Sequence, residues 1–154
     1  MPITTTTHLN FRGTARTALE FYQSVFGGHL TTITYSDFGL PKHLPDADNL
    51  VFGQVTADNG FSIMAYDVPS HAPAATTPTT TTTRDNGTTL TNQECFVSVR
   101  GDTTEEVSAL WTKLADGADL IEQYGPSPWT PGFGMLTDRF GVTWILDVAV
   151  PHAG

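Results

Sequence analysis

The chain has 154 residues, which is enough for one domain with a sizeable core. Hydrophobic residues make up 39% of it and charged residues 15%, a balance that excludes an intrinsically disordered protein. The formal net charge of -9 argues against nucleic acid or an anionic membrane as a partner. No apolar run approaches the roughly 20 residues that span a bilayer, and no secretory signal opens the chain. We therefore expect a cytoplasmic protein.

The first half of the chain changes its hydrophobic period twice. Residues 4 to 11 alternate apolar and polar side chains, which predicts a strand. Apolar positions from Ala15 to Phe26 then follow helical spacing, with Gly13-Thr14 as the N-terminal turn and cap and Gly27-Gly28 as the end. A loop over residues 36 to 49 separates the first two of three further strands, which we expect at residues 30–35, 50–56 and 61–66.

The middle of the chain breaks this pattern. Residues 68 to 91 contain three prolines and a run of five threonines, Thr79 to Thr83. This composition predicts a long exposed linker, mobile over Ala74 to Asn86. An inert tether and a functional lid both fit it.

The second half repeats the order of the first. A strand is expected at Gln93–Val99 and a helix at Thr103–Asp116, capped by Asp102 or Thr103. Strands follow at residues 118–124, 132–137 and 142–148, with Trp129 in a loop and a tight turn at Asp138 to Gly141. The repeat predicts an α+β fold of two βαβββ modules in a single domain over residues 1–154, with module one at about 1–67 and module two at about 92–150. Two such sheets are expected to enclose a cleft.

Two stretches at opposite ends of the chain carry a family resemblance. Leu9-Asn-Phe-Arg-Gly13, Ala18-Leu-Glu-Phe-Tyr22 and Val25-Phe-Gly27 look like the opening of PhnB-like proteins. Residues Trp129 to Trp144 resemble the ending of the same proteins. The chain thus resembles the PhnB-like branch of the vicinal-oxygen-chelate superfamily, which includes glyoxalases, bleomycin-resistance proteins and dioxygenases. The resemblance implies two βαβββ modules with a glyoxalase-like cleft, and a homodimer.

Metal-dependent members of that family hold one divalent ion with four ligands from the first and last strands of the modules. Carried over by position, the ligand set falls at Thr6, Met64, Glu94 and Ile145. Only the carboxylate among these four is an ordinary ligand for such an ion. We therefore predict no metal and no other cofactor. A displaced site made of His8, Glu94 and Asp147 stays open as an alternative.

Several polar side chains are candidates for catalysis or for contact with a ligand. The polar face of the first strand presents His8 and Asn10, and we expect the matching strand of module two to present Glu94, Phe96 and Ser98. His8 is the candidate general base, because an imidazole exchanges protons near neutral pH, and Glu94 is the candidate acid or base. The alternative without a catalytic role is that His8 and Glu94 form a hydrogen-bonded pair or are separate surface groups.

Aromatic side chains complete the predicted binding site. Phe52, Trp129 and Phe133 are candidates for an apolar pocket wall, with core packing as the alternative. Two classes of function follow for a small molecule bound between the modules. One is a lyase, isomerase or dioxygenase-like enzyme of the superfamily, and the other is a non-catalytic protein that sequesters its ligand, as resistance proteins do. A protein that serves only in an assembly is a weaker third reading.

Overall fold

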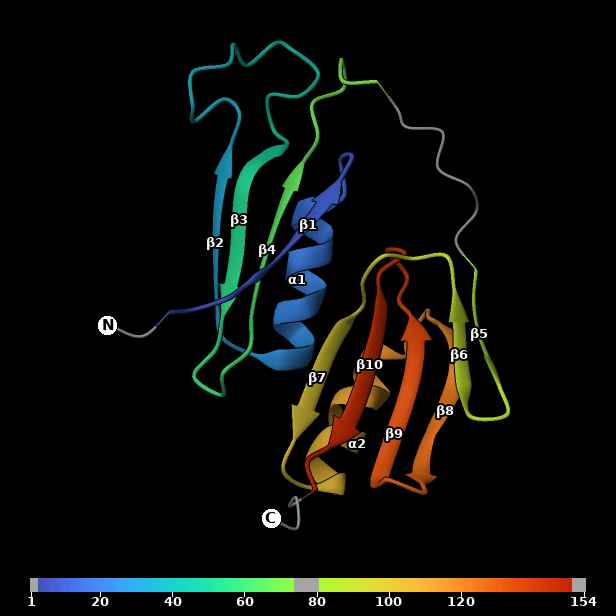
Figure 1. Cartoon of the computed structure of the whole chain (residues 1–154). Coiled ribbons are helices and arrows are strands. Elements are labelled where there is room, and N and C mark those ends of the chain that lie inside the picture. The colour runs from blue at the N-terminus through green and yellow to red at the C-terminus, as the bar shows by residue number, and fades with distance from the viewer. Residues whose placement is uncertain (1–2, 74–80, 151–154) are drawn as a thin grey trace. The chain divides into compact units, whose positions relative to one another are not determined.

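The computed structural model describes residues 3–73 and 81–150. The chain divides into two compact units, Met1–Ala75 and Thr76–Gly154, and each unit contains one βαβββ module. The predicted α+β fold of two modules is therefore confirmed (Figure 1). None of the helices in these described ranges is long and apolar enough to cross a membrane.

In the first unit a four-stranded sheet carries one helix on one face (Figure 1). The strand order is β1-β4-β3-β2, and β1 pairs with β4 in parallel while the other pairs are antiparallel. A parallel pair needs a long crossover, and the helix is part of it. The elements are β1 (Thr7–Phe11), α1 (Ala15–Phe26), β2 (His29–Thr34), β3 (Leu50–Thr56) and β4 (Ser62–Asp67).

The second unit repeats this sheet and adds a hairpin. Its sheet has the order β7-β10-β9-β8, with β7 and β10 in parallel, and β5 and β6 form a separate two-stranded sheet. The elements are β5 (Thr82–Asp85), β6 (Thr88–Thr91), β7 (Val97–Gly101), α2 (Thr104–Leu114), β8 (Asp119–Ser127), β9 (Thr130–Thr137) and β10 (Thr143–Val148).

Helix α1 has the predicted bounds, but its N-terminus is capped by a side chain of strand β4. The Thr14 side chain makes no capping hydrogen bond. Instead the buried Asp67 carboxylate of β4 accepts from the backbone N–H groups of Gly13 at 2.7 Å and Ala15 at 3.0 Å, and from that of Leu50 at 2.9 Å. A carboxylate at a helix N-terminus also meets the positive end of the helix dipole. Helix α2 is capped as predicted, because the Thr103 side chain accepts from the Glu106 N–H. The helix spans Thr104–Leu114 rather than the predicted Thr103–Asp116.

The segment interpreted as a linker contains the β5–β6 hairpin, so this interpretation was wrong for residues 82 to 91. The turn is formed by Asn86 and Gly87, which have positive φ angles of 49° and 79°. A two-residue Asn-Gly turn with this geometry is a strong hairpin signal. The threonines beside it favour a strand, because they are β-branched. Residues 74–80 of the predicted mobile segment lie outside the described residues.

The sequence pattern predicted that this strand begins at Gln93, but β7 begins at Val97. Glu94 and Phe96 therefore precede the strand, and Cys95 is exposed. Strand β8 also runs on to Ser127, so the expected loop shrinks to a short turn that holds Trp129. Strand alternation alone did not fix these ends, because an apolar run on its own does not mark where pairing starts.

One backbone hydrogen bond in each module shows which residues of the two modules are equivalent. The Val68 N–H donates to the Phe11 carbonyl at 2.7 Å, and the Ala149 N–H donates to the Gly101 carbonyl at 2.8 Å. Phe11 and Gly101 are therefore equivalent, since each follows the same parallel pair. Counting back from these two residues, His8 of β1 is equivalent to Ser98 of β7. Glu94 is then equivalent to Thr4, and both residues precede their strands. The predicted equivalence of Thr6 and Glu94 was off by two residues.

Candidate functional site

We call the side of each sheet opposite its helix the open face. On the helix side of the first sheet, Ile63, Ala65 and Val55 are buried. Because side chains alternate along a strand, the neighbouring positions lie on the open face. On the first sheet these are His8, Asn10, Phe52, Gln54, Met64 and Tyr66, and on the second sheet they are Ser98, Arg100, Phe133, Met135, Ile145 and Asp147.

His8 lies at the edge of the first open face, where it is exposed. Its Nδ1 atom is 3.2 Å from the Asn10 carboxamide oxygen, and its ring centroid is 5.5 Å from that of Tyr66. Because the carboxamide oxygen can only accept, this contact selects the tautomer with hydrogen on Nδ1. The Nε2 lone pair is then the basic position of the ring. Phe52, on β3 and separated from β1 by β4, is half-buried.

An ion pair lies across β7 and β10 on the second open face. Arg100 donates from Nε to one Asp147 oxygen and from Nη2 to the other, each at 2.9 Å. The hydrogen bonds to Asp147 and its negative charge raise the pKa of Arg100 above its ordinary value. Both Asp147 oxygens are therefore engaged by Arg100.

A cluster of two aromatic and two charged side chains lies beside this ion pair. We define this aromatic cluster as Trp129, Phe133, Arg84 and Glu122. The Trp129 and Phe133 rings meet edge to face, with centroids 5.3 Å apart and planes at 70°. The Arg84 guanidinium from β5 lies 4.9 Å from the Phe133 centroid and 5.8 Å from that of Trp129. Its Nε atom is 3.9 Å from a Glu122 carboxylate oxygen on β8.

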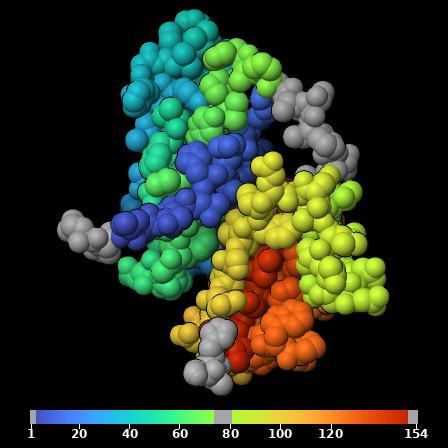
Figure 2. Space-filling model, in the orientation of Figure 1, coloured from blue at the N-terminus to red at the C-terminus, as the bar shows by residue number. Residues whose placement is uncertain are grey.

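The β5–β6 hairpin brings Arg84 to this place. The Thr89 hydroxyl of β6 lies 3.6 Å from the Met135 sulfur of β9, and the Gln93 amide donates to the Thr143 hydroxyl of β10. Figure 2 shows part of this face, with β10 in red between β7 in yellow and the hairpin in yellow-green. Sequence reasoning missed Arg84 because it placed the residue in a linker, and the Asn86-Gly87 turn was the signal that would have found the hairpin.

The structure brings some of the predicted site residues together and leaves others apart. Phe133 and Trp129 are in contact, and His8 contacts Asn10. Ser98 pairs with Ile145 on the second open face. Glu94 is exposed and Phe96 half-buried, and both lie in the irregular segment before β7 rather than on the sheet. The strand face that was expected to present them begins with Ser98 instead.

The residues present do not fit the metal that the family resemblance implies. Within residues 3–73 and 81–150, no group of three or more His, Cys, Asp or Glu side chains is placed to hold an ion. His8 faces Met64 across its strand pair, and the equivalent Ser98 faces Ile145. For the displaced site, Asp147 is already bonded through both oxygens to Arg100.

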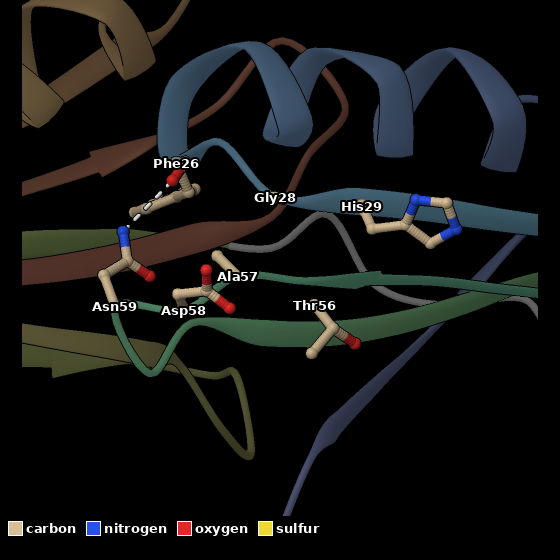
Figure 3. A pocket seen from close by; sticks show the side chains of 7 residues that line it. All are labelled: Phe26, Gly28, His29, Thr56, Ala57, Asp58 and Asn59. Atoms are coloured by element: carbon tan, nitrogen blue, oxygen red, sulfur yellow. Dashed lines mark hydrogen bonds between the residues drawn. The ribbon is translucent and has the colours of Figure 1, made fainter.

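A separate hollow of about 450 Å³ lies at the end of α1, against the β3–β4 turn (Figure 3). Its rim is fixed by Asn59, whose amide donates to the Phe26 carbonyl at 3.1 Å. His29 and Asp58 are exposed there. None of the predicted site residues lines this hollow, so the open faces remain the stronger candidates.

Comparison with known proteins places the chain in a family. Residues 7–146 match the model of the Glyoxalase/Bleomycin resistance protein/Dioxygenase superfamily, whereas no curated protein sequence matches the chain. Protein PA1353 from Pseudomonas aeruginosa has a similar structure, with 26% identity, a TM-score of 0.76, and coverage of 96% of this chain and 98% of that one.

A PhnB protein from Bacillus cereus is also similar, with 27% identity and a TM-score of 0.68 over 96% of this chain and 100% of that one. A glyoxylase/bleomycin resistance protein/dioxygenase domain from Frankia sp. EAN1pec shares the fold, at 11% identity and a TM-score of 0.62 over 99% and 95% of the two chains. The chain therefore belongs to the glyoxalase/bleomycin resistance/dioxygenase superfamily, and its structure is similar to that of a PhnB protein.

Proposed function

We propose that the protein binds a small organic molecule at the open face of its second sheet, without the family's metal. The observation that carries this proposal is the Trp129–Phe133 pair. Trp129 is 50% exposed although it lies against a buried ring and a charged side chain. A large aromatic surface beside a few fixed polar groups is the usual composition of a small-molecule site. The polar groups here are Arg84 and Glu122.

Removal of the Trp129 ring tests the proposal. A set of small aromatic compounds is screened by ¹H–¹⁵N NMR, and the strongest binder that shifts the Trp129 indole signal is titrated. Trp129→Ala is expected to weaken its binding by about 5- to 150-fold, or roughly 1–3 kcal/mol, because the stacking surface is lost.

Phe38→Ala is the matched control, because Phe38 is an aromatic residue that is 78% exposed in the other unit. Binding should be unchanged in this variant and in wild-type protein treated with a chelator. Equal weakening by both variants would contradict the assignment to this face. Loss of binding on chelation would contradict a metal-free site.

The His8–Asn10 contact favours a second function, acid–base catalysis by the first open face. With Nδ1 held by Asn10, the Nε2 atom of His8 is positioned to accept a proton. If the bound molecule is also turned over, His8→Gln is expected to lower kcat by about 100-fold or more. The measurement is a single-turnover assay by NMR, with His43→Gln as the control in an exposed loop. Full activity of the His8 variant would exclude this role.

A further inference from the structure

We propose that Arg84 selects a ligand that carries an oxyanion, such as a carboxylate, on a small aromatic or apolar body. This inference rests on the proposed function, since the body of the ligand would pack on Trp129. It names the class of molecule that the second open face takes, although the chain as a whole is acidic.

The guanidinium of Arg84 is buried with most of its hydrogen-bonding capacity unused. Its side chain is only 10% exposed. Within the described residues it makes one hydrogen bond, from Nη1 to the Thr89 hydroxyl at 2.9 Å. Its Nε is the only buried side-chain nitrogen or oxygen in the described ranges that lacks a hydrogen-bond partner. A buried donor without a partner costs free energy, and a ligand that supplies the acceptor recovers it.

The cluster holds this group in place before any ligand arrives. Phe133 and Trp129 both lie within cation–π distance of the guanidinium. The bond to Thr89 comes from the paired strand of the same hairpin, where Arg84 faces Thr89 directly. Glu122 is too far from Nε, at 3.9 Å, to accept a hydrogen bond. A fixed guanidinium loses little entropy when it binds, which favours affinity.

The protein itself shows what this edge of a guanidinium binds. In Arg100 the same two atoms, Nε and Nη2, hold both oxygens of Asp147 at 2.9 Å. In Arg84 that edge has no hydrogen-bond partner among the described residues. A planar group with two oxygens matches it in geometry and charge. The unpaired edge is therefore suited to a carboxylate, and a phosphonate offers the same chemistry.

A cationic ligand is the rival occupant, because Glu122 and the two rings also suit a cation. Arg84 already occupies the position over the rings, however, with its guanidinium near both centroids. A cation would have to displace it and break the bond to Thr89. An anion can meet the edge at Nε, which has no hydrogen-bond partner and lies 3.9 Å from the Glu122 carboxylate, without displacing the guanidinium from the rings. The anionic ligand is favoured for this reason.

The experiment compares probes that share one ring and differ in charge: benzoate, phenylphosphonate, neutral benzamide and cationic benzamidine. Each is titrated into the full chain while the Arg84 Nε–H and Trp129 indole signals are followed by ¹⁵N NMR. Benzoate or phenylphosphonate is expected to bind at least tenfold more tightly than benzamide and to shift the Arg84 signal. The order of these two probes tells a carboxylate site from a phosphonate site.

Two substitutions test the edge itself. Arg84→Lys keeps the charge but loses the planar edge, and Arg84→Gln removes the charge, so both are expected to weaken anion binding at least tenfold. Glu122→Gln is expected to tighten it, because a repulsive carboxylate is removed. Arg16→Gln makes the same change of charge on the exposed face of α1 and should leave binding unchanged. Amide spectra of each variant confirm the fold.

Three results would overturn the inference. Tightest binding of benzamidine, strengthened by Arg84→Gln, would identify a cation site that Arg84 fills. Equal binding of benzoate and benzamide, lost in Trp129→Ala but not in Arg84→Gln, would refute the anion and leave the proposed function standing. No shift of the Trp129 indole signal with any probe would refute both at this face.

Discussion

Replacement of Asp67 by Ala is expected to lower the free energy of unfolding of the first unit by about 3–5 kcal/mol. The carboxylate is 1% exposed and accepts hydrogen bonds from three backbone N–H groups, at Gly13, Ala15 and Leu50. It thereby fastens the start of α1 and the start of β3 to the end of β4. Removal of the acceptor leaves these N–H donors without a hydrogen-bond partner, at positions that water reaches poorly. Each such donor costs about 1–3 kcal/mol.

The readout must report on the first unit alone. The three tryptophans, at positions 111, 129 and 144, all lie in the second unit. Hydrogen exchange of the α1 amides is therefore the measurement, with the α2 amides for comparison. Asp48→Ala, at an exposed position, is the control, and Asp67→Asn should fall between, since one oxygen remains. A loss below about 1 kcal/mol would show that another group caps the helix.

Asp138→Ala is the second large effect, expected to lower the free energy of unfolding of the second unit by about 3–4 kcal/mol. Asp138 is 4% exposed, and one oxygen accepts from the indole N–H of the fully buried Trp144 at 2.9 Å. The other accepts from the backbone N–H groups of Phe140 and Val142, at 2.8 and 3.0 Å. The substitution removes the acceptor of a buried indole and the brace of the β9–β10 turn together.

Tryptophan fluorescence during urea unfolding reports this second effect, because the unit contains every tryptophan of the chain. Asp119→Ala is the control, as it removes an exposed carboxylate at the start of β8. The midpoint should fall for Asp138→Ala with little change in the slope. An unchanged midpoint would mean that the turn and the indole do not depend on this carboxylate.

The sequence determined the elements whose signals are local. Helix α1 has the predicted bounds because its apolar period and terminal glycines act within a few residues of each other. The βαβββ repeat was predicted for a similar reason, since each module carries the full pattern in order. The tight turn at Asp138 was also visible as a local motif, and its backbone hydrogen bonds confirm it.

Tertiary structure decided the partners of the site. Sequence reasoning named Trp129 and Phe133, but only the folded hairpin brings Arg84 over their rings from about fifty residues earlier in the chain. Likewise, Asp67 caps a helix that begins fifty-two residues before it. Register explains the remaining error: a shift of two residues keeps the same strand face, so periodicity could not tell Glu94, Phe96 and Ser98 apart. That choice depended on where β7 begins to pair with β10, and this long-range pairing is what the local pattern does not contain.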